Sequence, residues 1–332
     1  MILQRRLIIC CLFLTVELVF SQNSSLQGKW ETISTTNLPL ARHENSFVRV
    51  KHKFYLIGGR GIKPVSIYHT KTNTWSEGAK PPIEIHHFQA VAYKGNIYVF
   101  GAMTGKYPYE TPLPNVLVYN PKKDIWIEEG IEIPKGRRRG SAGVVIKKDR
   151  AYIVSGIVDG HNSTHVPWLD VYNFRSKKWE VLKDAPRSRD HFNAVIKDDK
   201  IYAVGGRNSS YATKQTFHLT ISEIDVYNIK TDSWTTLSKK NNLKIPRAGA
   251  SCAILGDDLI IIGGESMLQK EAHNEVDAYN FETKTWRKLA NLNRGRHGSQ
   301  AIVYKKALYI VAGSGNRGGR PELSSMEKFI IE

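Results

Sequence analysis

The chain has 332 residues, of which 41% are hydrophobic, and its 48 lysines and arginines against 31 aspartates and glutamates give a formal net charge of +17. This length fits one large all-β domain or two ordinary domains, and the excess of positive charge favours acidic partners. Three cysteines, two of them within the first 11 residues, exclude a disulfide framework as the main source of stability.

The N-terminus carries the pattern of a secretory signal peptide. Arg5 and Arg6 precede an apolar run over 7–20, and Val19-Phe20-Ser21 offers a cleavage site. The run is short for a membrane span, so the pattern predicts a signal peptide over 1–21, with a signal anchor as the alternative. We therefore expect a secreted or periplasmic protein with no membrane span after cleavage. Export argues against a nucleic-acid partner.

Cleavage would leave Cys252 as the one cysteine of the mature chain. It lies in the apolar stretch Ala250-Ser251-Cys252-Ala253-Ile254. This context predicts a buried, inert thiol rather than a nucleophile.

The rest of the chain is organised by a repeat. Six of the seven tryptophans recur at intervals of 45 to 55 residues: Trp30, Trp75, Trp126, Trp179, Trp234 and Trp286. Five of them have a tyrosine seven residues upstream: Tyr68, Tyr119, Tyr172, Tyr227 and Tyr279. Self-similarity at such a period indicates stacked supersecondary units.

Each unit predicts four short strands. In the second unit these are 88–93, 97–101 and 116–120, with a fourth that begins at Trp126. The second strand of every unit ends in a pair of small residues: Gly58-Gly59, Gly101-Ala102, Ser155-Gly156, Gly205-Gly206, Gly263-Gly264 and Ala312-Gly313. Small residues permit unusual backbone angles and close approach of neighbouring backbone.

A strand, paired small residues, a tyrosine and then a tryptophan resemble the kelch repeat, over the whole mature chain. The resemblance implies an all-β, six-bladed propeller with four-stranded antiparallel blades. We expect a single domain over 22–332, with repeats at about 38–78, 79–130, 131–183, 184–238, 239–290 and 291–332. The last repeat lacks its tryptophan and Trp30 lacks its tyrosine, so we expect 27–34 to supply the outer strand of the last blade and close the ring.

Strand direction predicts which face carries the function. The loops from the second to the third strand and the connections between blades emerge on one face, and the short turns emerge on the other. The former reach 16 residues between Ala102 and Tyr119 and 20 between Gly206 and Tyr227. Long loops on a rigid scaffold are where binding residues concentrate.

A triplet before the innermost strand aligns across the units. Its members are Arg42-His43-Glu44, Ile85-His86-His87, Arg139-Gly140-Ser141, Arg189-Asp190-His191, Arg247-Ala248-Gly249 and Arg296-His297-Gly298. The five arginines predict a ring of guanidinium groups around the channel mouth that binds an acidic ligand. The alternatives are that each arginine bonds loop carbonyls between blades, or that Glu44 and Asp190 offset the charge.

The other triplet positions gather histidines and carboxylates. We take His43, Glu44, Asp190 and His191 as candidate catalytic residues and His86, His87 and His297 as ligand-binding candidates. General acid and base chemistry near neutral pH, a metal site, and histidines satisfied by backbone of neighbouring blades are three interpretations. No ligand spacing within a single element supports the metal, so we predict neither metal nor cofactor.

The long loops add further candidates. They are Tyr107, Tyr109, Glu110, Asp159, His161, His165, Trp168, Arg207, Tyr211, Glu265, His273, Glu275 and the basic run 316–320. Trp168 is the tryptophan outside the repeat, and it is interpreted either as a stacking surface for a ligand or as packing for its loop. We include Trp168 and Arg207 among the ligand-binding candidates.

Two functions follow as expectations. The first is a binding module that holds an acidic small molecule, glycan or acidic peptide over the channel mouth. The second comes from resemblance: exported six-bladed kelch proteins include the sialic-acid mutarotases, which interconvert anomers of an acidic sugar. The galactose-oxidase type of kelch protein fits poorly, because its copper–radical chemistry needs a cysteine-crosslinked tyrosine on a seven-bladed propeller. Fold alone does not decide between these functions.

Overall fold

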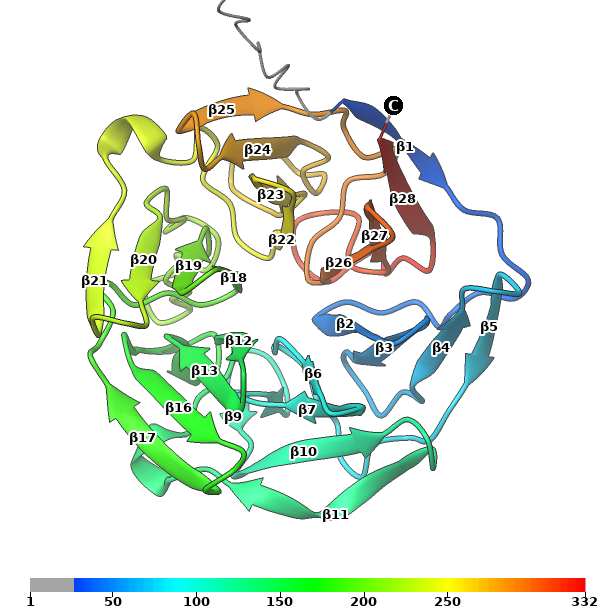
Figure 1. Ribbon diagram of the computed structural model, residues 1–332, viewed down its shortest axis with the longest axis horizontal. Coiled ribbons are helices and arrows are strands. Elements are labelled where there is room, and N and C mark those ends of the chain that lie inside the picture. Colours follow the sequence, from blue (N-terminus) through cyan, green and yellow to red (C-terminus); the bar gives the residue numbers. More distant parts are fainter. Residues whose placement is uncertain (1–26, 332) are drawn as a thin grey trace, which may run out of the picture.

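The computed structural model describes residues 27–331, and the predicted signal peptide lies outside the described residues. Six four-stranded antiparallel sheets surround a central axis, each with its first strand innermost (Figure 1). The predicted six-bladed propeller is therefore confirmed. No helix of the described part is long and apolar enough to cross a membrane.

The third blade illustrates the local structure. It contains β12 (Gly143–Lys147), β13 (Arg150–Val154), β16 (Leu169–Asn173) and β17 (Lys178–Leu182), each paired with the next. Valine and isoleucine are frequent in β12 and β13, and both faces of these strands are covered by the flanking blades. A small hairpin, β14 (Ile157–Asp159) with β15 (Ser163–His165), interrupts the loop between β13 and β16.

The other blades repeat this arrangement. The first contains β2 (Asn45–Val50), β3 (Lys53–Gly58), β4 (Ser66–His69) and β5 (Thr74–Glu77). The second contains β6 (Val91–Tyr93), β7 (Asn96–Val99), β10 (Asn115–Asn120) and β11 (Ile125–Glu132), with the hairpin β8 (Met103–Thr104) and β9 (Thr111–Pro112) in its loop. The fourth contains β18 (Asn193–Lys197), β19 (Lys200–Val204), β20 (Asp225–Asn228) and β21 (Ser233–Thr236). The fifth contains β22 (Ser251–Leu255), β23 (Asp258–Ile262), β24 (Val276–Asn280) and β25 (Thr285–Lys288). Two short 3-10 helices, Lys135–Arg137 and Lys239–Asn241, lie in the connections between blades.

The repeated tyrosines and tryptophans hold the outer strands. Tyr172 and Trp179 are directly opposed on β16 and β17, with ring centroids 5.2 Å apart. The Trp179 indole also donates a hydrogen bond to the carbonyl of Glu132 at the end of the preceding blade. Four other repeat tryptophans do the same to the preceding blade, namely Trp30, Trp126, Trp234 and Trp286. These residues are therefore architectural.

The ring closes through the N-terminal strand. β1 (Gly28–Thr32) pairs with β28 (Met326–Ile331), which continues through β27 (Ala307–Val311) to β26 (Ala301–Tyr304). Trp30 lies opposite Phe329, and its indole bonds the carbonyl of Ala290 in the fifth blade. The predicted closure is confirmed, and Figure 1 shows β1 outside β28.

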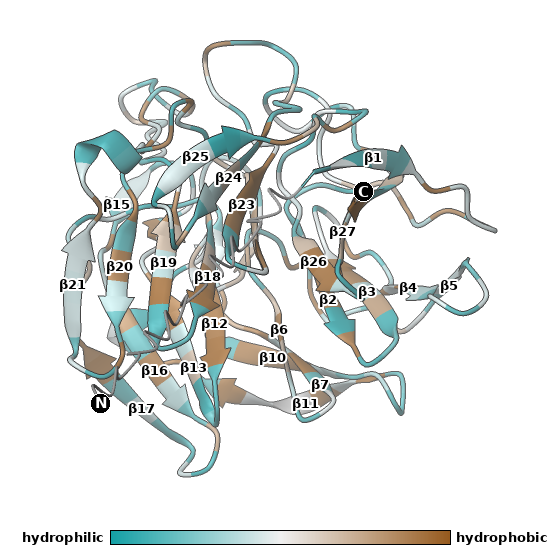
Figure 2. Cartoon of the chain, turned by 45° about the horizontal axis from the view of Figure 1, so that its top comes forward, coloured by the Kyte–Doolittle hydropathy of each residue, from teal (hydrophilic) through white to brown (hydrophobic). Residues whose placement is uncertain are grey.

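The apolar core lies between neighbouring blades. One cluster joins Tyr55 and Ile57 of the first blade to Ile97 and Val99 of the second. Figure 2 shows the hydrophobic residues concentrated along the strands. Cys252 lies in one such cluster, and burial raises the pKa of its thiol to about 12, so it is the buried, unreactive thiol that its sequence context predicts.

Candidate functional site

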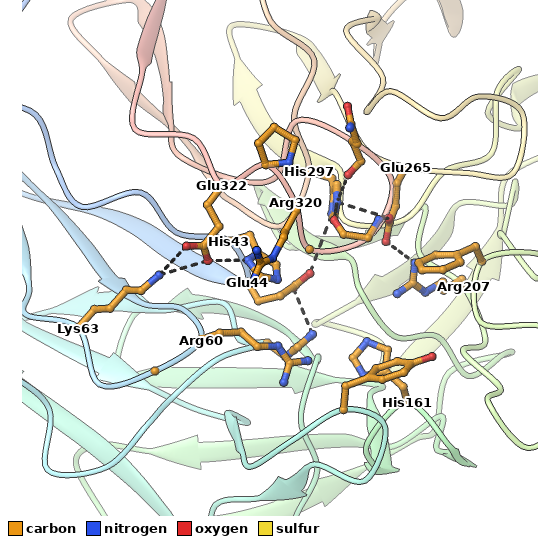
Figure 3. Close-up of a pocket in the computed structure, with 18 residues that line it drawn as sticks. His43, Glu44, Arg60, Lys63, His161, Arg207, Glu265, His297, Arg320 and Glu322 are labelled. Carbon is orange, nitrogen blue, oxygen red and sulfur yellow. Dashed lines mark hydrogen bonds and ion pairs between the residues drawn. The ribbon is translucent and has the colours of Figure 1, made fainter.

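A pocket of about 1250 Å³ opens on the axis, on the face that carries the long loops. Every lining residue comes from a loop between the second and third strands or from a connection that precedes an innermost strand, as strand direction predicts. The lining consists of His43, Glu44, Arg60, Gly61, Lys63, His87, Tyr107, His161, Arg207, Phe217, Glu265, His297, Asn316, Gly318, Gly319, Arg320, Pro321 and Glu322 (Figure 3).

The third triplet position forms a ring around the axis. All six members have left-handed backbone angles, with φ between 49° and 65°: Glu44, His87, Ser141, His191, Gly249 and Gly298. Backbone N–H groups of His87 and Ser141 donate to the carbonyls of Glu44 and His87, and Gly298 donates likewise to Gly249. Adjacent blades are thus hydrogen-bonded at the axis. Non-glycine residues at positive φ are strained and cluster at functional sites, and four members of this ring are not glycine, namely Glu44, His87, Ser141 and His191.

The predicted ring of ligand-binding guanidinium groups is wrong. Each of the five arginines is at most 3% exposed and points into its own blade, where it bonds the carbonyl 16 residues downstream: Arg42, Arg139, Arg189, Arg247 and Arg296. Four also pair with a carboxylate of the third strand, namely Asp170, Asp225, Asp277 and Glu327. Burial lowers the pKa of Arg139 and Arg189 to about 10, so both remain charged at neutral pH. The arginines therefore join the strands within each blade.

Three histidines from three blades meet at the floor of the pocket. His87 precedes β6, His161 lies in the β14–β15 hairpin, and His191 precedes β18. The ring centroids are separated by 4.9 Å for His87–His161, 4.8 Å for His87–His191 and 4.7 Å for His161–His191. One nitrogen of each lies within 4.8 Å of those of the other two. All three side chains are buried.

The Nδ1 atom of each imidazole in this cluster has a partner. His87 Nδ1 lies 2.6 Å from His86 Nδ1, His161 Nδ1 lies 3.0 Å from the Glu110 carboxylate, and His191 Nδ1 bonds Asp190. Burial lowers the pKa of His161, and burial together with the neighbouring His86 lowers that of His87 further. Neutral imidazoles therefore dominate at pH 7 at these two positions.

Carboxylates and cations alternate around the histidines. Glu44 Oε2 lies 3.5 Å from His87 Nε2, and its Oε1 lies 4.0 Å from His297 Nδ1. Glu265 pairs with Arg207, and Figure 3 shows the pair beside His297. Burial opposes ionisation of Glu265, but His297 and Arg207 lower its pKa to about 2. The floor is thus a charged network that the protein itself neutralises.

The rim carries a second network. Figure 3 shows Glu322 between Lys63, at 2.9 Å, and His43, at 2.8 Å. Arg60 pairs with Glu110 in the wall. Arg320 is exposed, and among residues 27–331 no carboxylate forms an ion pair with it.

Besides the five arginines, four of the predicted catalytic and ligand-binding residues do not line the pocket, namely His86, Trp168, Asp190 and His191. Asp190 is fully buried and occupied by His191, His165 and Ser209. His86 is also fully buried, and its Nε2 bonds the carbonyl of Gly105. Trp168 does not line the pocket, and the Arg137 guanidinium lies over its ring, 4.3 Å from the centroid. The predicted stacking surface at Trp168 is therefore wrong, and the alternative, packing of its own loop, describes the structure.

Some of the loop candidates line the pocket, namely Tyr107, His161, Arg207, Glu265 and the run 316–320 except Arg317. The others do not: Tyr109, Glu110, Asp159, His165, Tyr211, His273 and Glu275. Arg60, Lys63, Phe217 and Glu322 line the pocket without having been predicted. Their loops are the second-to-third loops of the first, fourth and sixth blades, so loop position was the available signal.

Several known Kelch proteins are similar to this chain in sequence. Kelch-like protein terF of Aspergillus terreus is 28% identical over 314 residues, covering 88% of this chain and 66% of terF. Human Kelch-like protein 23 is 24% identical over 86% of this chain and 48% of its own length, and beta-scruin of Limulus polyphemus is 25% identical over 85% and 31%. The chain thus spans between about a third and two thirds of these relatives.

The solved structure of YjhT superposes with a TM-score of 0.74 at 16% identity, over 88% of this chain and 95% of YjhT. At this identity the likeness shows a shared fold. A family model described as the KLHDC2/KLHL20/DRC7 Kelch-repeats domain matches residues 90–313, more than half of the sequence. The chain therefore belongs to this family of Kelch-repeat domains.

Proposed function

We propose that the axial pocket binds a small acidic ligand, such as an anionic sugar, in an exported protein. The observation that carries the proposal is the charge of the lining. Arg60, Lys63, Arg207 and Arg320 line the pocket, against the carboxylates Glu44, Glu265 and Glu322. Three of these cations already pair with carboxylates of the protein. Arg320 is then the guanidinium available to a carboxylate or sulfate, which its planar fork fits in a bidentate manner.

Size and aromatic surface support a sugar. A volume of about 1250 Å³ exceeds what a single monosaccharide needs. Tyr107 is 48% exposed at the mouth, and its ring centroid lies 5.7 Å from that of Tyr211, which is 44% exposed. Exposed aromatic rings beside polar groups offer an apolar face to a sugar ring and a hydroxyl to its substituents.

Anomer exchange is the second candidate. His43 and Glu44 line the pocket and could contact a sugar, whereas Asp190 lies behind the surface. The four catalytic candidates therefore do not act as one exposed set. Any proton transfer would depend on His43 and Glu44, with Asp190 as a positioning residue for His191.

Calorimetric titration with uronic, sialic and sulfated sugars tests the proposal. We expect binding by the wild type and a loss of affinity of about 10- to 100-fold in Arg320→Gln, because one charge-assisted contact is removed. Arg175→Gln is the matched control, since Arg175 lies in the turn between β16 and β17 on the opposite face. Absence of binding by the wild type, or equal affinities of the two variants, would refute the acidic ligand. NMR exchange between anomers of any sugar that binds then separates enzyme from binder.

A further inference from the structure

We propose that His87, His161 and His191 together bind one divalent transition-metal ion at the floor of the axial pocket. This inference goes beyond acidic-ligand binding. The sequence predicts no metal because no single strand or loop carries two ligands at a metal-binding spacing. Here the three ligands come from three blades.

The geometry of the cluster suits one ion. The three ring centroids form a nearly equilateral triangle, with sides of 4.9, 4.8 and 4.7 Å. Candidate ligand nitrogens lie within 4.8 Å of one another. Nitrogens bound to one tetrahedral ion at about 2.0–2.1 Å are roughly 3.4 Å apart. Small rotations of the three side chains, which move each nitrogen by about 1 Å or less, would bring them to bonding distance.

The hydrogen bonds of the imidazoles leave the ligand atoms free. His161 and His191 direct Nδ1 to the carboxylates of Glu110 and Asp190, and His87 directs Nδ1 to His86. An outer carboxylate on the second nitrogen of a ligating histidine fixes its tautomer and raises its basicity, a frequent arrangement around protein metals. Nε2 is the nitrogen that remains for the ion in His161 and His191, and in His87 it lies 3.5 Å from Glu44 Oε2, a carboxylate oxygen that the ion would also attract.

An independent observation concerns His191. Its Nε2 atom is buried and has no hydrogen-bond partner among the residues that the structure describes. A buried polar atom without a partner lowers the stability of the fold and calls for an explanation. A metal ion bound to this atom supplies one.

The backbone holds two of the ligands in strained positions. His87 and His191 have φ of 55° and 49°, and the corresponding positions of two other blades are glycines. A site retains such strain when the surrounding structure enforces it, as the inter-blade hydrogen bonds do here, from Ser141 N–H to the His87 carbonyl and from Gly249 N–H to the His191 carbonyl. The inner ring thereby aims two imidazoles at the axis.

The donor set selects the class of metal. Imidazole nitrogens suit Zn²⁺, Fe²⁺, Co²⁺, Ni²⁺ or Cu²⁺, whereas Mg²⁺ and Ca²⁺ prefer oxygen ligands. Three neutral ligands leave the charge of the ion to be balanced, and Glu44, Glu110 and Asp190 lie around the cluster. His87 and His161 also line the open pocket. A three-histidine site that faces a pocket leaves a coordination position for water or for an oxygen of the bound ligand.

Metal content and affinity test the site directly. The full chain, purified without a polyhistidine tag and stripped with EDTA, is titrated with Zn²⁺ and with Co²⁺ and then analysed by elemental mass spectrometry. We expect about one ion per chain and, for Co²⁺, visible d–d absorption of a nitrogen-ligated site. Uptake far below one ion per chain would overturn the proposal.

Variants separate the cluster from other histidines. We expect His161→Ala to bind Zn²⁺ at least about 100-fold more weakly. Glu110→Gln keeps all three histidines but removes the outer carboxylate and its ion pair with Arg60, and we expect it to bind Zn²⁺ about 10- to 100-fold more weakly. His52→Ala is the matched control, because His52 is exposed in the turn between β2 and β3 on the opposite face. Since His161→Ala could lower stability by itself, the rise in Tm that Zn²⁺ causes is compared within each protein. The same rise in His161→Ala as in the wild type would contradict the assignment.

Discussion

Two positions of one triplet, two residues apart, behave in opposite ways. The first position is arginine in five of six blades. In each of these blades the arginine is buried, and it bonds the carbonyl at the equivalent position, 16 residues downstream. The third position varies from Glu44 through Ser141 to Gly298, and it forms the ring at the axis. A residue type that recurs at one position contacts equivalent neighbours in every blade, so it stabilises the blade. A residue type that differs from the repeat at its position can contact a residue of another blade, and the residues of the candidate site are of this kind.

Removing a repeated arginine tests the first half of this comparison and has the largest expected effect. Arg296→Met leaves the carboxylate of Glu327, which is 1% exposed in its side chain, without its cation. Breaking a buried pair from one side costs about 3–5 kcal/mol. Urea denaturation should show this loss in the free energy of unfolding.

Arg42→Met is the matched control for this variant. Its guanidinium bonds the carbonyls of Gly58 and Pro64 and the hydroxyl of Ser66, so no buried carboxylate of the third strand is left behind. We expect a smaller cost, of about 1–3 kcal/mol. A loss below 1 kcal/mol in Arg296→Met would argue against the arginines as blade-internal ties.

A β-carbon added to the axial ring tests the second half. Gly298 has φ of 65°, and a Cβ there would lie 2.9 Å from Glu44 Oε1 and 3.0 Å from Glu44 N. Gly298→Ala should therefore cost about 1–3 kcal/mol through strain and contact. It should also displace the Glu44 carboxylate from His87. Chemical denaturation measures the first effect, and a crystal structure of the variant measures the second.

Ser141→Ala provides the comparison for Gly298→Ala. Ser141 already carries a Cβ at φ of 52°, and its buried hydroxyl has no hydrogen-bond partner within the described residues. Its removal should change stability by less than about 0.5 kcal/mol. Equal losses in the two variants would mean that Gly298 makes no special room for Glu44.

The same distinction explains what could be predicted from the sequence. Blade number and closure follow from Tyr172, Trp179 and their equivalents, because a contact that recurs in every blade requires the same residue types at the same spacing in the sequence. Closure by Trp30 followed from a gap in that repeat. The direction of the Arg189 side chain cannot be predicted in this way. The repeat places the residue near the start of the innermost strand, but it does not determine whether the side chain points to the axis or into the blade.

The histidine cluster illustrates the remaining limit. His87, His161 and His191 come from three consecutive blades, and the arrangement of these blades around the axis brings them together. The triplet alignment already places His87 and His191 at equivalent positions. His161 lies in the hairpin of a second-to-third loop, and these loops differ in length from blade to blade. Its position near the axis therefore depends on the conformation of this one loop, which the repeat does not predict.

Glu322 should contribute less to stability than Arg296 or Gly298, because it belongs to one loop of one blade and lies on the rim. Burial opposes its ionisation, but hydrogen bonds from His43 and Lys63 lower its pKa from 4.5 to about 2. Because the folded-state pKa is depressed, the ionised carboxylate stabilises the fold fully above about pH 4.5 and loses this contribution as the pH falls toward 2. With a side chain 28% exposed, the loss between pH 7 and pH 3 should be only about 1 kcal/mol.

Urea denaturation at both pH values should show a smaller drop in stability in Glu322→Gln than in the wild type, while the exposed Glu282→Gln should match the wild type. An equal drop in all three proteins would mean that the rim pair does not stabilise the fold, and that the sixth-blade loop is held by its backbone bonds, such as that from Leu323 N–H to the Gly313 carbonyl.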